Sequence, residues 1–319
     1  MTRSQLPFLV RGIHNLTLPH QGCVLTIGNF DGVHRGHQAV ISQLVAKAKM
    51  HQVPAMVMLF EPQPQEYFAP AQAPARLSSL RDKLRRLAAL GIDHVLCIKF
   101  NAAFAHWDAD RFIDELLVAR LGVRHLVVGD DFHFGQQRRG NFALLRQAGQ
   151  QHGFTVQDTA SCVVGQQRIS STLIRQAIAL GAFDRAAQML GYRYVIDGRV
   201  SHGNKLGRTL SFPTANLGLQ RLVSPLRGVY AVRVKLADGQ RLLGVANVGT
   251  RPTVQGKDCR LEVHIFNFSG EIYGQRMEVE LVAWLRDEQR FESITALKAQ
   301  ISADVDQAKR RLSASEYSV

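Results

Sequence analysis

A glycine-rich turn with two histidines is the first segment whose residue types and spacing suit catalysis. Residues Gly28 to His37 read Gly-Asn-Phe-Asp-Gly-Val-His-Arg-Gly-His, and they follow an apolar run and open a helical pattern. Backbone N–H groups at the start of a helix favour a phosphate, and Gly32 and Gly36 let the backbone approach a ligand closely. His34 and His37 share a face of the first helical turn, where they can donate hydrogen bonds to charge that builds on an α-phosphate and its pyrophosphate leaving group. The segment therefore predicts a nucleotidyl-transfer site.

Two plainer interpretations of the same histidines stay open. They are a possible zinc pair, but the sequence offers no third ligand of matching spacing. They are otherwise surface histidines beside a glycine turn, an interpretation that the flanking Gly-x-Phe-Asp-Gly pattern makes less favourable.

Two later segments of the N-terminal half are also candidates for ligand binding. The loop from Gly129 to Gly135 follows an apolar run, and its phenylalanines, Phe132 among them, favour a bound ligand over a solvated loop. Asn141, a little further on, suits a helix cap. The run from Ile169 to Arg175 opens a helix, and its hydroxyls either cap that helix or hold a phosphate together with the arginine.

The C-terminal half contains residues suited to phosphates and to a hard cation. Residues 198–208 are rich in glycine and basic side chains, and they can form a backbone nest for phosphates although they lack the Gly-Lys-Ser/Thr ending of a Walker A loop. Thr214 and Asn216 point to the same face of an extended chain, so their side-chain oxygens can jointly hold Mg²⁺ beside ATP phosphates. A local turn motif is the alternative.

Glu262 is the candidate general base of the C-terminal half. In Leu-Glu-Val-His-Ile, residues 261–265, it shares a strand face with His264, opposite three apolar side chains. A carboxylate in that position can take a proton from a hydroxyl that attacks ATP. The alternative is an ordinary solvent-facing residue of a strand.

The elements that must position these residues differ between the two halves. Apolar runs at residues 24–27, 55–60, 95–98 and 125–128 alternate with helical patterns, two of which Gly91 and Gly122 should end. This alternation predicts an α/β domain with a Rossmann-like parallel sheet. Later runs at residues 194–200, 228–235, 241–248, 260–268 and 277–284 predict an antiparallel β-barrel. A closing helix should pack through Ile294, Leu297, Ile301, Val305 and Leu312. We expect domains at residues 1–186 and 187–319, connected through a short helix over 182–190.

Composition narrows the class of protein. The chain has 319 residues, a net charge of +13 and no dense basic tract, which suits anionic nucleotide substrates and argues against specific nucleic-acid binding. Its four cysteines are widely separated, and no run of 18 apolar residues occurs, so we expect a cytoplasmic protein without a membrane span. The oligomeric state is not predictable.

The three N-terminal segments together resemble, in order and spacing, the first module of the bacterial bifunctional riboflavin kinase/FMN adenylyltransferases, also called FAD synthetases. The resemblance implies a module that transfers the adenylyl group of ATP to FMN, giving FAD and pyrophosphate with the help of Mg²⁺. It implies ATP binding by Gly28, Asn29, His34, Gly36, His37, Ser171, Thr172 and Arg175. It places Asp31, Phe60, Asp130, Phe132 and Asn141 near nucleotide or flavin.

The C-terminal half resembles the riboflavin kinase module of the same family, through Phe-Pro-Thr-Ala-Asn at residues 212–216, Asn-Val-Gly-Thr-Arg-Pro at 247–252 and Leu-Glu-Val-His at 261–264. The resemblance implies that Thr214 and Asn216 bind Mg²⁺-ATP and that Glu262 is the base for the riboflavin hydroxyl. The predicted phosphate loop comprises Gly203, Lys205, Gly207 and Arg208. Leu173, Ser211 and Asn267 depart from residues that the family usually has.

Two rival functions follow from the same residues. The first is an adenylyl- or cytidylyltransferase that acts on another phosphorylated small molecule, which the second module argues against. The other is a basic binding protein that uses a nucleotide or flavin as a signal, which steep salt-dependent retention of RNA without turnover would support.

Overall fold

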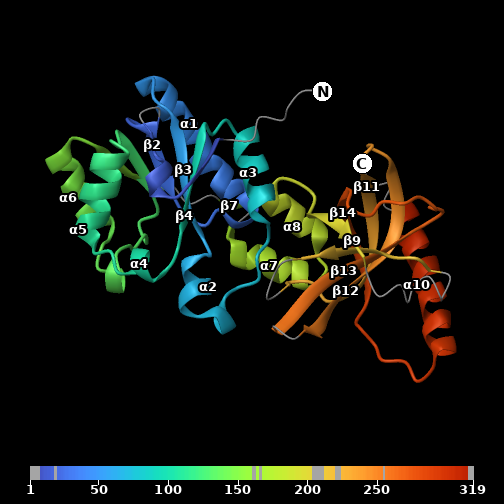
Figure 1. Ribbon diagram of the computed structural model, residues 1–319. Coiled ribbons are helices and arrows are strands. Elements are labelled where there is room, and N and C mark those ends of the chain that lie inside the picture. Colours follow the sequence, from blue (N-terminus) through green and yellow to red (C-terminus); the bar gives the residue numbers. More distant parts are fainter. Residues whose placement is uncertain are drawn as a thin grey trace. The chain divides into compact units, whose positions relative to one another are not determined.

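The computed structural model describes residues 8–17, 20–159, 163–164, 167–202, 212–219, 224–253 and 256–314. The chain forms two compact units (Figure 1). The first contains residues 1–74 and 78–170, and the second contains residues 75–77 and 171–319.

The first unit is built on a six-stranded parallel sheet, as the alternating pattern predicts. The strands are β1 (Phe8–Arg11), β2 (Val24–Ile27), β3 (Ala55–Glu61), β4 (His94–Lys99), β5 (His125–Val128) and β6 (Thr155–Asp158). Their order is β1-β4-β3-β2-β5-β6, and every neighbouring pair runs parallel. The two edge strands, β1 and β6, are additions to the four predicted strands. A separate two-stranded ribbon consists of β7 (Val163–Val164) and β8 (Gln167–Arg168).

Helices cover both faces of this sheet (Figure 1). On one face, α1 (Arg35–His51) and α3 (Leu80–Ala89) bury leucines against β2, β3 and β4. On the other face, the π-helix η5 (Phe112–Arg120) and α6 (Phe142–His152) enclose a second core. The remaining short helices are η1 (Ile13–Asn15), η3 (Asp31–Val33), α2 (Pro64–Phe68), η4 (Pro70–Gln72), α4 (Ala102–Ala105), α5 (Ala109–Arg111) and η6 (Gln136–Arg138). The doubly wound α/β prediction is therefore confirmed, and Gly91, with φ of 85°, lies just beyond the end of α3 as expected.

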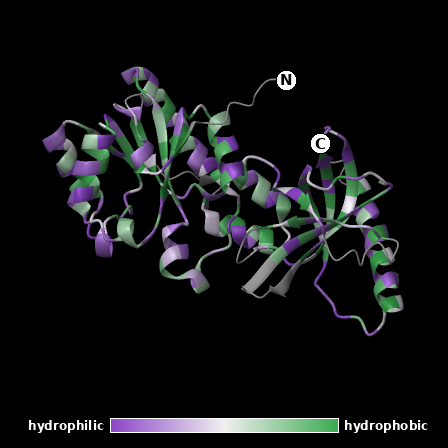
Figure 2. Ribbon diagram, viewed as in Figure 1, coloured by the Kyte–Doolittle hydropathy of each residue, from purple (hydrophilic) through white to green (hydrophobic). Residues whose placement is uncertain are grey.

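The second unit is a closed antiparallel barrel preceded by α7 (Ser171–Ala179) and α8 (Phe183–Leu190). Its strands are β9 (Val195–Ser201), β10 (Ala215–Gly218), β11 (Gly228–Leu236), β12 (Arg241–Thr253), β13 (Gly256–Ile265) and β14 (Arg276–Arg286). Around the barrel the order is β10-β13-β12-β11-β14-β9. Figure 2 shows hydrophobic and hydrophilic residues interleaved along these strands, as expected for one face turned to a core.

The predicted closing helix is α10 (Ile294–Ala314). Val305, Ala308 and Leu312 are buried against apolar residues of β11, β12 and β14. Ile294 does not share this role, because it is the first residue of the helix and is 69% exposed. The prediction that the whole stripe packs in the core is therefore wrong at its N-terminal end.

Candidate active sites

The glycine-rich turn leaves β2 in an unusual backbone conformation. Phe30 and Val33 have φ of 45° and 39°, and Gly32 between them has φ of 77°. Positive φ is uncommon outside glycine, and for a β-branched residue such as valine it is an outlier that the surroundings must hold in place. Phe30 and Val33 are both buried in the core beneath α1. The turn therefore fixes the backbone position of the next residue, His34.

His34 and His37 stack on each other at the start of α1, where the sequence predicts that they share a face. Their ring centroids are 3.6 Å apart with planes inclined by 16°. His34 is the N-cap of the helix, and its Nδ1 accepts a hydrogen bond of 3.3 Å from the backbone N–H of His37. The ring of Phe30 lies 4.9 Å from that of His37. Both imidazoles thus have defined orientations at the N-terminus of a helix, which favours an anion.

The environment of His37 keeps it neutral at physiological pH. Burial lowers the pKa of His37 well below its ordinary value, and the nearby His34 and Lys83 lower it further. Nδ1 of His37 is buried without a hydrogen-bond partner within the described residues. A neutral imidazole donates through one nitrogen and accepts through the other, so His37 can act as an oriented dipole towards a reacting phosphate.

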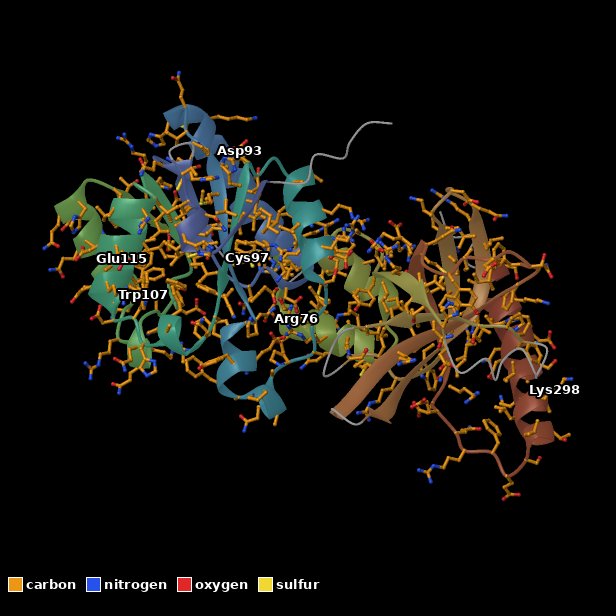
Figure 3. The ribbon with its side chains drawn as sticks, in the orientation of Figure 1. Arg76, Asp93, Cys97, Trp107, Glu115 and Lys298 are labelled. Atoms are coloured by element: carbon orange, nitrogen blue, oxygen red, sulfur yellow. The ribbon has the colours of Figure 1, made fainter. Side chains whose placement is uncertain are left out.

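A cavity of about 920 Å³ begins at Gly28 and Asn29 and extends between four loops of the first unit. Its walls are mainly aromatic: Phe60, Tyr67, Phe68, Phe100, Phe104, Trp107, Phe112, Phe132 and Phe134 all line it. Figure 3 labels Trp107 within this unit, and its ring packs against Phe104 at 5.2 Å. Flat apolar walls of this kind suit a large planar aromatic ligand, because aromatic rings stack in offset or edge-to-face arrangements.

The cavity includes only some of the residues that the resemblance places near a ligand. Phe60 and Phe132 are wall residues. Asp130 is exposed just beyond β5, and Asn141 caps α6 by accepting a hydrogen bond from the backbone of Leu144. Asp31 is buried and bonds to Ser78. The aromatic residues at 100–107 carry a signal that sequence reasoning missed, namely three aromatic rings directly after the third predicted strand.

The hydroxyl-rich segment lies in the second unit. Helix α7 begins at Ser171, with Thr172 next, so Ser170 stands immediately before the helix. One turn on, Nε of Arg175 donates a hydrogen bond of 2.5 Å to the carbonyl of Ala75. Leu173, the departure from the family pattern, is half-buried.

In the barrel, three polar residues lie side by side on neighbouring strands. Glu262 on β13 pairs in register with Asn216 on β10 and with Asn247 on β12. Its apolar neighbours Leu261 and Val263 are fully buried, which confirms that Glu262 points to the opposite face of the strand. Paired residues on one face of an antiparallel sheet lie within contact distance. The barrel therefore brings the candidate base next to one of the two candidate metal ligands.

Asn216 is buried and donates a hydrogen bond of 3.3 Å to the backbone carbonyl of Thr214. This bond uses the amide nitrogen, so the amide oxygen keeps its capacity to bind a cation. Two neutral oxygens are a suitable partial ligand set for Mg²⁺, which usually completes its shell with substrate phosphates and water. The predicted phosphate-loop residues Gly203, Lys205, Gly207 and Arg208, and the departure Ser211, lie outside the described residues.

The departure at residue 267 has a backbone explanation. Asn267 follows β13 with φ of 53°. Asparagine and aspartate are the non-glycine residues that best tolerate this left-handed region. Asn267 is therefore a residue type that suits this turn.

Comparison with known proteins assigns each unit to a family. The FAD synthetase family model matches residues 17–173, and the riboflavin kinase family model matches residues 190–312. The bifunctional riboflavin kinase/FMN adenylyltransferase of Escherichia coli K12 is 52% identical over 93% of this chain and 95% of its own. The protein of the same name from Haemophilus influenzae is 52% identical over 94% of this chain and 98% of its own.

A solved structure described as the macrolide-efflux protein of Streptococcus pneumoniae has the same fold over most of its length. It is 29% identical, with a TM-score of 0.73, and the match covers 94% of this chain and 97% of that chain. In the present protein, no helix within the described ranges is long and apolar enough to cross a membrane.

These matches define a two-module chain whose halves belong to flavin-handling transferase families, as the resemblance implies. The chain is a member of the bifunctional riboflavin kinase/FMN adenylyltransferase family.

Proposed function

We propose that the barrel phosphorylates riboflavin to FMN with ATP and that the α/β unit transfers the adenylyl group of a second ATP to FMN, giving FAD and pyrophosphate. The observation that best supports the second activity is the aromatic cavity, which starts at Gly28 and Asn29 in the same turn that leads to the stacked histidines. A flavin ring in this cavity would lie next to a site built for a phosphate.

In the α/β unit, the roles of the side chains follow from their placement. Phe60 and Phe132 would stack against or border the flavin ring. The FMN phosphate would attack the α-phosphorus of ATP in line, and the neutral His37 together with His34 would donate hydrogen bonds to the charge that develops there and on the leaving pyrophosphate. Gly28, Asn29 and Gly36 would leave backbone room for the phosphates.

The remaining nucleotide contacts of this reaction are part of the proposal. Ser171 and Thr172 at the start of α7 would offer hydroxyl and N–H donors to ATP, and Arg175 would add a positive charge. Asp31, Asp130 and Asn141 would lie near the nucleotide or the flavin. We propose a domain boundary at residues 186/187, within α8 and between the two family matches.

In the barrel, Glu262 would take the proton of the attacking riboflavin hydroxyl. Thr214 and Asn216 would hold Mg²⁺, whose chemistry is to neutralise charge on the ATP phosphates. Gly203, Lys205, Gly207 and Arg208 would supply phosphate contacts of the second ATP. The proposal includes a cytoplasmic location, because both reactions use ATP.

Two substitutions test whether each unit carries out one of the two reactions. His37→Ala should abolish FAD formation from FMN and ATP while it spares FMN formation from riboflavin. Glu262→Ala should do the reverse. Chromatography of the products made with riboflavin, ATP and Mg²⁺ measures both reactions in one assay.

The matched controls are His14→Ala and Glu292→Ala, since His14 and Glu292 are exposed residues of the same types in the same units. Both controls should leave both activities unchanged. Loss of both activities in either test variant, with the fold intact by circular dichroism, would contradict two separate sites. Absence of both products from the wild-type protein would refute the flavin assignment itself.

A further inference from the structure

Ser78, one residue before the N-cap of α3, reaches the turn that precedes the two histidines. Its hydroxyl accepts a hydrogen bond of 3.0 Å from the backbone N–H of Gly32 and donates one of 3.3 Å to Oδ1 of Asp31. The same oxygen of Asp31 also accepts a bond of 3.1 Å from the backbone N–H of Ser78. Ser78 and Asp31 are 5% and 2% exposed. One serine therefore holds two consecutive turn residues by three bonds that water does not reach.

These bonds act on a turn with an unusual backbone conformation. Phe30, Gly32 and Val33 all have positive φ, and two of them are not glycine. Such conformations persist only when the surrounding structure determines them. Burial of the Phe30 and Val33 side chains holds the two ends of the turn in this conformation. Ser78 holds the middle of the turn by hydrogen bonds, because its partners Asp31 and Gly32 lie between Phe30 and Val33.

The turn, held by its hydrogen bonds to Ser78, determines the position of both histidines. His34 follows Val33 directly and caps α1. Nε2 of Gln38, in the first turn of α1, donates a bond of 2.9 Å to the carbonyl of Val33. The ring of Phe30 contacts that of His37 with centroids 4.9 Å apart. A relaxed turn would therefore shift the N-cap and remove the ring that packs on His37.

We propose that Ser78 is a positioning residue for adenylyl transfer. Through Asp31 and Gly32 it holds the turn that aims His34 and His37 at the reacting phosphate, without contact of its own with a substrate. This inference rests on the proposed role of the two histidines. It also gives Asp31 a specific task, which is to connect Ser78 to the turn.

Ser78→Ala removes both hydroxyl bonds and tests the proposal. Because misplacement of a catalytic group lowers the rate more than the affinity, kcat for FAD formation from FMN should fall between about tenfold and about a hundredfold. The KM for FMN should stay within about twofold of wild type, since Ser78 is not among the residues that line the aromatic cavity. FMN formation by the barrel should be unchanged. Ser78→Thr keeps the hydroxyl and should restore most of the lost kcat.

The neighbouring serine is the matched control. Ser79 caps α3 and bonds with Asp82. Ser79→Ala therefore removes a helix cap next to Ser78 but none of the bonds between Ser78 and the turn. It should lower the melting temperature of the unit at least as much as Ser78→Ala, with kcat unchanged. An equal loss of kcat in both alanine variants would reduce Ser78 to a structural residue and overturn the proposal.

His37→Ala, measured in parallel, separates the two levels of inference. If it abolishes FAD formation while Ser78→Ala keeps kcat within twofold of wild type, the positioning role is wrong and the site stands. If His37→Ala retains FAD formation, the histidine site itself is wrong, and the role of Ser78 falls with it. Should Ser78→Ala fail to fold, Ser78→Cys, which keeps the size but weakens both bonds, decides the same question by its kcat.

Discussion

An ion pair between the half-buried Arg286 at the end of β14 and the buried Asp304 on α10 connects the closing helix to the barrel. Nε and Nη2 of Arg286 donate to the two carboxylate oxygens of Asp304 at 2.8 and 2.7 Å. The two side chains are 16% and 4% exposed. Gln300 adds a bond of 2.9 Å to the same carboxylate. Asp304→Ala would leave the half-buried guanidinium without its carboxylate partner.

The expected magnitude follows from that geometry. Removal of one member of a buried ion pair destabilises a protein by about 3–5 kcal/mol, because the remaining charge is left uncompensated. Replacement of both members by apolar residues of similar volume is often neutral, so Arg286→Met with Asp304→Leu should stay within about 1 kcal/mol of wild type. For a urea dependence of about 2 kcal/mol per M, a loss of about 4 kcal/mol moves the unfolding midpoint by about 2 M.

Tryptophan fluorescence can follow the barrel separately from the first unit. The chain has two tryptophans, Trp107 in the first unit and Trp284 on β14. In a Trp107→Phe background the fluorescence change on urea unfolding therefore reports on the barrel. A midpoint shift below about 0.5 M for Asp304→Ala, or an equal shift for the single and the paired replacement, would refute the reasoning, since the cost would then not arise from an unpaired charge.

Two other expectations concern the first unit. Gly140→Ala places a Cβ 2.6 Å from the ring of Phe134, a buried wall residue of the cavity, so it should raise the KM for FMN by about tenfold in steady-state assays. As a control from the second unit, Gly218→Ala on β10, whose Cβ meets nothing within 4 Å, should leave this KM unchanged. The folded state lowers the pKa of His37 and so disfavours its protonation. As the pH falls below about 6.5, His37 of the unfolded chain binds a proton before His37 of the folded chain does, so the free energy of unfolding should drop by up to about 1.4 kcal/mol at pH 5.5. In urea titrations, His37→Gln should reduce this dependence of the unfolding free energy on pH. The same pH dependence in the variant and the wild type would contradict the reasoning.

The regular elements were predictable wherever a run of apolar residues is buried on both sides. The run at residues 24–27 coincides with β2, and the run at 125–128 with β5. Strand β6, by contrast, has no buried residue and reads Thr-Val-Gln-Asp. It lies at an edge of the sheet, where one side faces solvent and the hydrophobic pattern is absent. Strand β6 is defined by its backbone hydrogen bonds to β5, which the amino-acid composition of the segment does not reveal.

The residues of the candidate sites also differ in how far the sequence alone predicts them. The two histidines and Glu262 stand in short motifs whose local spacing already implies a shared face. The aromatic side chains that line the cavity come from separate segments after β3, β4 and β5, so no local sequence pattern predicts the cavity. Ser78 is more remote still, since its partners are 46 and 47 residues away in sequence and it lies in no motif. Contacts of this range depend on the folded topology alone.

The π-helix η5 has a consequence for the effect of a deletion within residues 112–120. Its backbone bonds reach five residues back, as Leu121 N–H to the carbonyl of Leu116 shows. Deletion of one residue between Phe112 and Arg120 would favour the narrower turns of an ordinary α-helix and change the direction in which side chains at the two ends of the segment point. Phe112 would then leave the cavity wall, or Leu117 would leave the core. The number of residues in this segment therefore contributes directly to the shape of the cavity.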